Sequence, residues 1–149
     1  MTEQTRILVV DDDEGLTASL AAVLKKNGYV VDIAKSGKEA IEKSKAEYYD
    51  LALLDIRLPD MEGTELLTEM KDTFPKMVKI MITGFPSLQN AVEALNKGAD
   101  AYIIKPVIID NLLKTIETQL RKQREVREFA EDKVAEFIDR KVKELERGL

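Results

Sequence analysis

Acidic, hydroxyl and amine side chains recur directly after short apolar segments of this chain. The acidic run Asp11–Asp13 follows the segment ILVV, and Asp55 follows the segment LALL. Thr83 ends another apolar segment, and Lys105 lies between an apolar segment and a proline. Crowded carboxylates repel one another unless a cation lies among them, and a set of oxygen ligands favours Mg²⁺. A carboxylate nucleophile, a bound Mg²⁺, a lysine and a hydroxyl are the groups that phosphoryl transfer needs.

The composition narrows the chemistry further. The chain contains no histidine and no cysteine, which excludes the commonest general base, the usual zinc ligands and any thiolate reaction. Any reaction must therefore use carboxylates, hydroxyls and lysines.

Five short apolar segments are predicted to be β-strands, and amphipathic stretches between them are predicted to be helices. The strands are expected at Ile7–Val10, Tyr29–Ala34, Leu51–Leu54, Lys79–Thr83 and Ala101–Ile104. Several of them are continuous in Val, Ile and Leu, as parallel strands buried on both faces are. Ser36 and Glu39 predict a capped start for the second helix, Gly28 the end of the first, and Thr64–Lys71 a third helix.

Regular alternation of strand and helix indicates an α/β fold with a parallel sheet and helices on both faces. In such folds the functional site lies beyond the carboxyl ends of the strands. Asp11–Asp13, Asp55, Thr83 and Lys105 all follow or end predicted strands, so they are expected to converge at one edge of the sheet. Asp is also common where helices begin, and Asp13 is better explained as such a helix-start acid.

Length and charge exclude several classes of protein. A chain of 149 residues suits one domain with its own core, and its apolar runs are too short to span a bilayer. Residues 121–149 carry nine Lys/Arg and eight Asp/Glu, and subtracting this +1 from the whole-chain −5 leaves −6 for residues 1–120. An acidic domain is a poor nucleic-acid binder. We expect a cytoplasmic protein with no direct contact to DNA or membrane.

Four segments, in order, resemble the receiver domains of bacterial-type response regulators. They are ILVVDDDEG, LLDIRLPDMEG, the Thr-Gly of MITGF, and GADAYIIKP, and together they cover almost all of residues 5–120. The resemblance implies a flavodoxin-like, doubly wound five-stranded parallel sheet in the order 2-1-3-4-5. It also implies a two-component signalling protein that accepts a phosphoryl group from a sensor histidine kinase. Such a protein is a switch that catalyses only its own phosphorylation and dephosphorylation.

The resemblance assigns roles at the acidic edge. Asp55 is similar to the family's phosphoryl acceptor, and Asp12 to its direct Mg²⁺ ligand. Asp11 is similar to a ligand that often binds the metal through water. The backbone carbonyl of Arg57 is similar to a further ligand.

The resemblance also assigns the switch residues. Lys105 is similar to the lysine that pairs with the phosphoryl group, and its bond to Pro106 is expected to be cis. Thr83 is similar to the switch hydroxyl, and Tyr102 to an aromatic that turns inward on phosphorylation, although a strand aromatic can equally be filler. The family's output surface lies on the fourth helix, fifth strand and fifth helix. Arg57 and Phe85 occupy positions that tune how long the phosphoryl group survives, but Phe85 can also be a plain exposed contact.

Two other functions are compatible with parts of this pattern. An aspartate-nucleophile phosphohydrolase would use Asp11 and Asp13, but Gly15 stands where such enzymes carry Thr or Val, and Asp55 would have no role. A constitutive scaffold would not need the complete acceptor set.

The last part of the chain changes character. We expect a receiver at residues 1–120 and a charged amphipathic helical extension at 121–149, with one helix running from about Ile109 to Arg147. An apolar stripe passes through Val126, Phe129, Ala130, Val134, Phe137, Ile138, Val142, Leu145 and Leu149. The recurrence is too long for a clean heptad seam. The stripe can pack on a second copy as a homodimer, fold back on the receiver, or lead to a missing output module.

Overall fold

The structure, a computed structural model, describes residues 4–70 and 73–148. The strands are β1 (Arg6–Val10), β2 (Val30–Ala34), β3 (Leu51–Asp55), β4 (Val78–Thr83) and β5 (Ala101–Ile104). The helices are α1 (Glu14–Lys26), α2 (Gly37–Ala46), α3 (Gly63–Glu69), α4 (Leu88–Asn96) and α5 (Ile109–Arg147). The five predicted strands are confirmed to within a residue at each end.

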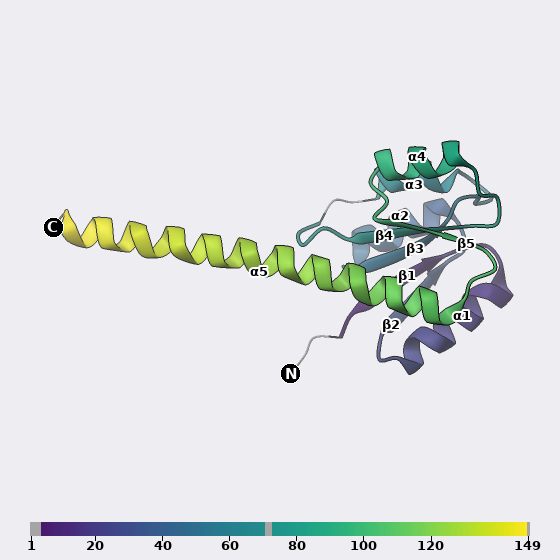
Figure 1. Ribbon diagram of the computed structural model, residues 1–149, viewed down its shortest axis with the longest axis horizontal. Helices are drawn as coiled ribbons and strands as arrows, with labels where there is room; N and C mark the ends of the chain where they lie inside the picture. Colours follow the sequence, from purple (N-terminus) through teal and green to yellow (C-terminus); the bar gives the residue numbers. More distant parts are fainter. Residues whose placement is uncertain (1–3, 71–72, 149) are drawn as a thin grey trace.

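The five strands form one parallel sheet in the order β2-β1-β3-β4-β5, as the resemblance implies. Helices α2, α3 and α4 cover one face, and α1 and α5 cover the other (Figure 1). Strand β3 lies at the centre between β1 and β4, and all five of its residues are buried. This burial on both faces explains why its sequence is continuously apolar up to Asp55.

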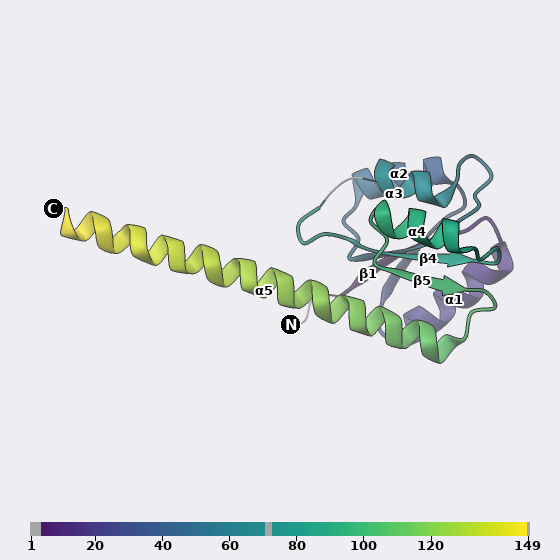
Figure 2. The ribbon, with the colours of Figure 1, turned by 45° about the horizontal axis from the view of Figure 1, so that its top comes forward.

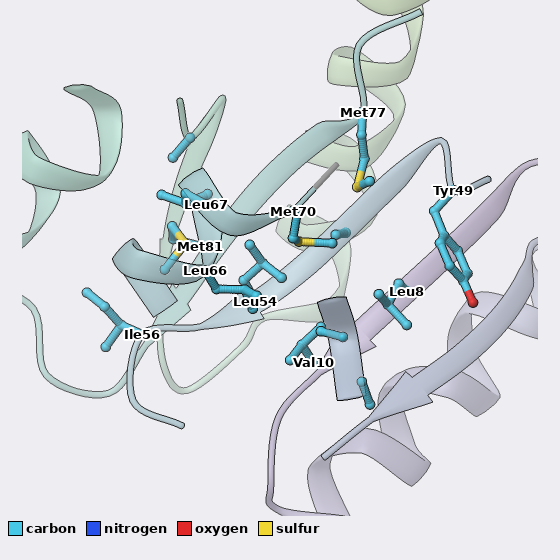
Figure 3. Close-up of a cluster of buried hydrophobic side chains, with 14 of the residues drawn as sticks. Leu8, Val10, Tyr49, Leu54, Ile56, Leu66, Leu67, Met70, Met77 and Met81 are labelled. Carbon is cyan, nitrogen blue, oxygen red and sulfur yellow. The ribbon is translucent and has the colours of Figure 1, made fainter. Parts of the chain in front are cut away.

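Alternate side chains of each strand supply two separate cores. Leu8 and Leu54 point to the core beneath α2, α3 and α4, where Leu66, Leu67 and Met81 also pack (Figure 3). Ile7 and Leu53 belong to the opposite core, which α1 and α5 close. The sheet is thus held rigidly from both sides, and the loops at its carboxyl edge project from a fixed frame.

The helix ends follow the sequence signals closely. Asp13 caps α1 by accepting from the backbone N–H of Leu16, and Ser36 caps α2 by accepting from that of Glu39. Gly28, after α1, has a φ of +92°, a conformation that favours glycine. The third helix spans Gly63–Glu69 rather than Thr64–Lys71, because Met70 is already extended, and Lys71 lies outside the described residues.

Helix α5 is continuous over 39 residues and projects well beyond the sheet (Figures 1 and 2). Leu112, Ile116 and Leu120 are buried against the sheet. One turn later the side-chain amide of Gln123 donates to the backbone carbonyls of Asp50 and Lys76, each at 2.9 Å. Since α5 crosses residue 120 without a break, the division there stays a prediction. In the described part of the chain, no helix has the length and apolar character that crossing a membrane requires.

Asp60 joins the loop after β3 to the start of α2. Its two carboxylate oxygens accept from the backbone N–H groups of Gly37 and Lys38 at 2.8 and 2.9 Å. These two bonds hold the pKa of Asp60 below its ordinary value. A group with a lowered pKa stabilises the fold at pH values above its unfolded pKa, and that contribution disappears as the pH falls through the folded pKa.

We therefore expect Asp60→Ala to lower the free energy of unfolding at neutral pH, because two helix-start N–H groups lose their acceptors. Urea unfolding at a series of pH values measures the effect. The difference from the parent protein should shrink as the pH falls below about 4, where the carboxyl is protonated in the unfolded chain. Glu62→Ala, in the same loop but without a side-chain cap bond, is the control and should be nearly neutral. Equal losses for both variants would contradict this role for Asp60.

Candidate functional site

The carboxyl edge of the sheet gathers polar side chains from four segments. Asp11 follows β1, Asp55 ends β3, Thr83 ends β4 and Lys105 follows β5. These strands lie side by side in the sheet, so their ends meet at one edge. Three of the four side chains are in direct contact through ion pairs, as the expected convergence requires.

Three carboxylates form the acidic part of the site. Asp11, Asp12 and Asp55 each offer an oxygen, and these atoms lie within 4.8 Å of one another. Asp11 and Asp55 are buried, at 4% and 8% exposure, whereas Asp12 faces solvent. Asp13 is not part of this group, since its carboxylate caps α1. The alternative reading that used Asp11 with Asp13 therefore loses one of its two acids to the helix start.

Lys105 neutralises part of this charge. Its ammonium nitrogen lies 3.1 Å from a carboxylate oxygen of Asp11 and 3.7 Å from one of Asp55. The backbone N–H of Lys105 donates to the carbonyl of Thr83 at 2.7 Å, which fixes the start of its loop on β4. The Lys105–Pro106 peptide bond is cis, as expected.

The charge state of Asp55 reflects its surroundings. Burial raises the pKa of this carboxyl above its ordinary value, and the nearby Asp11 raises it further. Lys105 and the backbone N–H of Arg57, 3.4 Å from the carboxylate, act in the opposite direction, and Asp12 adds a smaller upward effect. The upward effects win, so the charged form of Asp55 is disfavoured here unless further positive charge is added.

A divalent cation suits this site. The donors are carboxylate oxygens, and the chain has no histidine or cysteine to attract a softer metal. An added cation would offset both the burial and the repulsion by Asp11 that raise the pKa of Asp55. The residues present therefore fit Mg²⁺.

Thr83, Arg57 and Phe85 lie along the rim beside these acids. Thr83 is fully buried, and its hydroxyl oxygen accepts from the backbone N–H of Phe85 at 2.9 Å. The guanidinium carbon of Arg57 lies 4.0 Å from the centre of the Phe85 ring, a cation–π contact. Phe85 remains 56% exposed, so this stacked pair lies at the surface and not in the core.

Tyr102 lies on β5, three residues before Lys105. Its ring is partly buried and packs against the core beneath α2, α3 and α4. Within the described chain, its hydroxyl is one of two buried side-chain polar atoms that have no hydrogen-bond partner. Such a group costs free energy until it finds a partner.

Two contributors to the site were not predicted from the sequence. A side chain at Gly63 would place its Cβ 2.2 Å from the backbone carbonyl oxygen of Asp55, so only glycine allows this close approach. Asp60 ties the same loop to α2. The Pro-Asp and Glu-Gly pairs of LPDMEG indicate a turn, but not these distant partners.

Comparisons with known proteins agree with this geometry. The family model described as the response regulator receiver domain matches residues 7–117. The transcriptional regulatory protein ZraR of Escherichia coli (strain K12) is 42% identical over 114 residues, which are 76% of this chain and 26% of that protein. The chain thus spans about a quarter of the length of this curated relative.

Solved structures show the same fold. A response regulator receiver domain protein (CheY-like) from Methanospirillum hungatei JF-1 is 48% identical, with a TM-score of 0.79 over 83% of this chain and 98% of that one. A response regulator from Burkholderia pseudomallei, solved with a phosphorylated aspartic acid, a calcium ion and citrate, is 27% identical, with a TM-score of 0.70 over 83% of this chain and 73% of that one. The matched family model, the relatives and the sheet order together show that this chain belongs to the response regulator receiver domain family of two-component signalling.

Proposed function

We propose that the protein accepts a phosphoryl group on Asp55 from the phosphohistidine of a sensor histidine kinase. The observation that carries this proposal is the position of Asp55 at the end of the central strand, within reach of two further acids and 3.7 Å from the Lys105 ammonium. The Burkholderia relative, whose structure contains a phosphorylated aspartic acid, supports the same chemistry.

In the transfer, a carboxylate oxygen of Asp55 attacks the phosphorus atom of the donor. A new O–P bond forms as the N–P bond to the donor imidazole breaks, and the electron pair of that bond stays on the imidazole nitrogen. Lys105 then pairs with a phosphoryl oxygen, because its ammonium already lies between Asp11 and Asp55. The protein thus catalyses only its own phosphorylation and, through water, its dephosphorylation.

Asp11, Asp12, Asp55 and the backbone carbonyl of Arg57 would hold Mg²⁺. Three of these four groups form the carboxylate cluster. The bound ion supplies positive charge that offsets the phosphoryl oxygens.

The signal then passes to the surface formed by α4, β5 and α5. A phosphoryl oxygen on Asp55 offers the Thr83 hydroxyl a new, charged acceptor, and Thr83 already holds the backbone N–H of Phe85. Movement of Thr83 therefore moves the loop that leads into α4. Tyr102, with its unpartnered hydroxyl, can adjust at the same time. Exposed apolar side chains cover this surface, among them Leu88 at 83% and Ile108 at 62% exposure, so a shift in their arrangement changes what the surface binds.

The acceptor assignment predicts the outcome of labelling with acetyl phosphate and Mg²⁺. One base-labile phosphoryl group should form per chain, and peptide mapping should place it on Asp55. Asp55→Asn should abolish labelling with the fold intact by circular dichroism, whereas Asp13→Asn should label normally because Asn also caps helices well. Undiminished labelling of Asp55→Asn would refute the assignment. Multiple turnover of an aryl phosphate would favour the phosphohydrolase instead.

The metal assignment predicts a separate effect for Asp12→Asn. This variant should lose both the Mg²⁺-dependent rise in thermal stability and most of the labelling, because a ligand is gone. In EDTA it should unfold no more easily than the parent protein, because one source of carboxylate repulsion has been removed. A clear loss of stability in EDTA would show that Asp12 is needed for the fold and not for the metal.

The Arg57–Phe85 pair is proposed to tune phosphoryl lifetime by covering the acceptor. Phe85→Ala should shorten the half-life of the acyl phosphate, since water gains access, and a barrier change of about 1 kcal/mol corresponds to roughly fivefold. The decay of pre-labelled protein gives the half-life directly. Leu88→Ala, an exposed change at the start of α4, is the control and should leave decay unchanged. An unaltered half-life in Phe85→Ala would show that the Arg57–Phe85 contact does not affect phosphoryl lifetime.

A further inference from the structure

The proposed function gives no role to the connection between β2 and α2, which comprises residues 34–38 and is called here the β2–α2 connection. It leaves the carboxyl end of β2, and β2 is paired with β1 in the sheet. The connection therefore lies at the same edge as the acidic site. It contacts both of the loops that carry the proposed metal ligands, one on each side.

On one side the connection holds the segment that carries Asp12. The backbone N–H of Asp11 donates to the carbonyl of Ala34 at 3.1 Å. Two residues beyond Asp12, a carboxylate oxygen of Glu14 lies 2.6 Å from the ammonium of Lys35. Among the described residues, none forms a hydrogen bond or an ion pair with the carboxylate of Asp12 itself. The position of this ligand thus depends on its backbone, which the connection fixes on both sides of it.

On the other side the connection holds the loop between β3 and α3, which contains Arg57. The carboxylate of Asp60 accepts from the backbone N–H groups of Gly37 and Lys38 at 2.8 and 2.9 Å. The side chain of Met61 packs beside these bonds, so closely that a Cβ on Gly37 would overlap it. Two hydrogen bonds and a tight apolar contact therefore fix this loop to the start of α2.

We propose that the β2–α2 connection is a brace that holds Asp12 and the backbone carbonyl of Arg57 in position for Mg²⁺, with Lys35 and Asp60 as the positioning residues. This inference rests on the metal role proposed above for Asp12 and Arg57. Groups that orient metal ligands without touching the metal typically change metal affinity by about 10–100-fold when they are removed. The Lys35–Glu14 pair is exposed, and exposed pairs add little to the stability of a fold. Its loss should therefore alter metal binding more than unfolding.

The positive charge of Lys35 separates this role from a purely electrostatic one. A lysine beside a metal site repels a divalent cation, so by charge alone its removal would strengthen Mg²⁺ binding. Loss of a brace has the opposite effect, because the apparent dissociation constant rises as the fraction of molecules with correctly placed ligands falls. The direction of the change in affinity therefore distinguishes the two roles.

The dissociation constant for Mg²⁺ is measured from the amide chemical shifts of the folded protein as the metal is added. Lys35→Gln should raise it about threefold, as it would if the ligands were in place about a third of the time. Asp60→Asn should raise it about tenfold, because one of two helix-start N–H groups loses its acceptor. The exchanged pair Glu14→Lys/Lys35→Glu should recover most of the affinity. Lys45→Gln is the charge-matched control at the end of α2, since this lysine has no ion pair in the described chain, and it should bind Mg²⁺ no more weakly than the parent protein.

A second control separates the brace from a general loss of stability. Tyr49→Phe removes the 2.6 Å hydrogen bond to Asp32 from a residue that precedes β3, at the opposite edge of the sheet. It should lower the unfolding temperature and leave the dissociation constant for Mg²⁺ unchanged. A rise in that constant equal to the rise in Asp60→Asn would show that the effect is one of stability and would overturn the brace.

The titrations also separate this inference from the proposed function. Unchanged or tighter Mg²⁺ binding in Lys35→Gln, or no recovery in the exchanged pair, overturns the brace and leaves the metal ligands as assigned. Absence of Mg²⁺ binding in the parent protein overturns the metal assignment and the brace together. The labelling of Asp55 is measured separately and decides the acceptor assignment by itself.

Discussion

The burial of β3 determines where the acids can go. All five residues of this strand are buried, it is paired on both sides, and both faces of the sheet are covered by helices. Asp55 at its end therefore cannot withdraw from Asp11, which directly follows the adjacent strand β1. The repulsion between these carboxylates is imposed by the core. It can be relieved by protonation or by counter-charge, which Lys105 supplies in part and a divalent cation can supply further.

The loops at the carboxyl edge of the sheet are also fixed by their contacts with the ends of the buried strands. The turn after β3 must pass close to the Asp55 carbonyl, which only Gly63 permits, and Asp60 then secures that turn to α2. On the other side, the Lys105 N–H is bonded to the Thr83 carbonyl, so the strand that carries the lysine and the strand that carries the hydroxyl are fixed together.

The fold was largely predictable because its strands are buried on both faces. Strands of this kind appear in the sequence as continuous runs of Val, Ile and Leu. Asp55 and Lys105 were predictable as neighbours because parallel strands align their carboxyl ends. Contacts between loops far apart in the chain were not predictable. Nothing in the residues around Asp60 indicates that its partners are Gly37 and Lys38. The side-chain orientation of Tyr102 and the stacking of Arg57 on Phe85 likewise depend on packing that no periodicity reports.

Gln123 fixes α5 to the sheet at one point, and the helix beyond it projects freely in the described part of the chain. Its amide is bonded to the carbonyl one residue before β3 and the carbonyl two residues before β4, so the direction of the helix is fixed relative to the central strand and its neighbour. From Gln123 to Arg147 the helix continues for 24 residues, which is about 36 Å at 1.5 Å per residue. A tilt of about 10° at the sheet would displace the far end by roughly 6 Å over that length. A rigid arm of this kind converts a small rotation within the domain into a displacement the size of a side chain at a distant point.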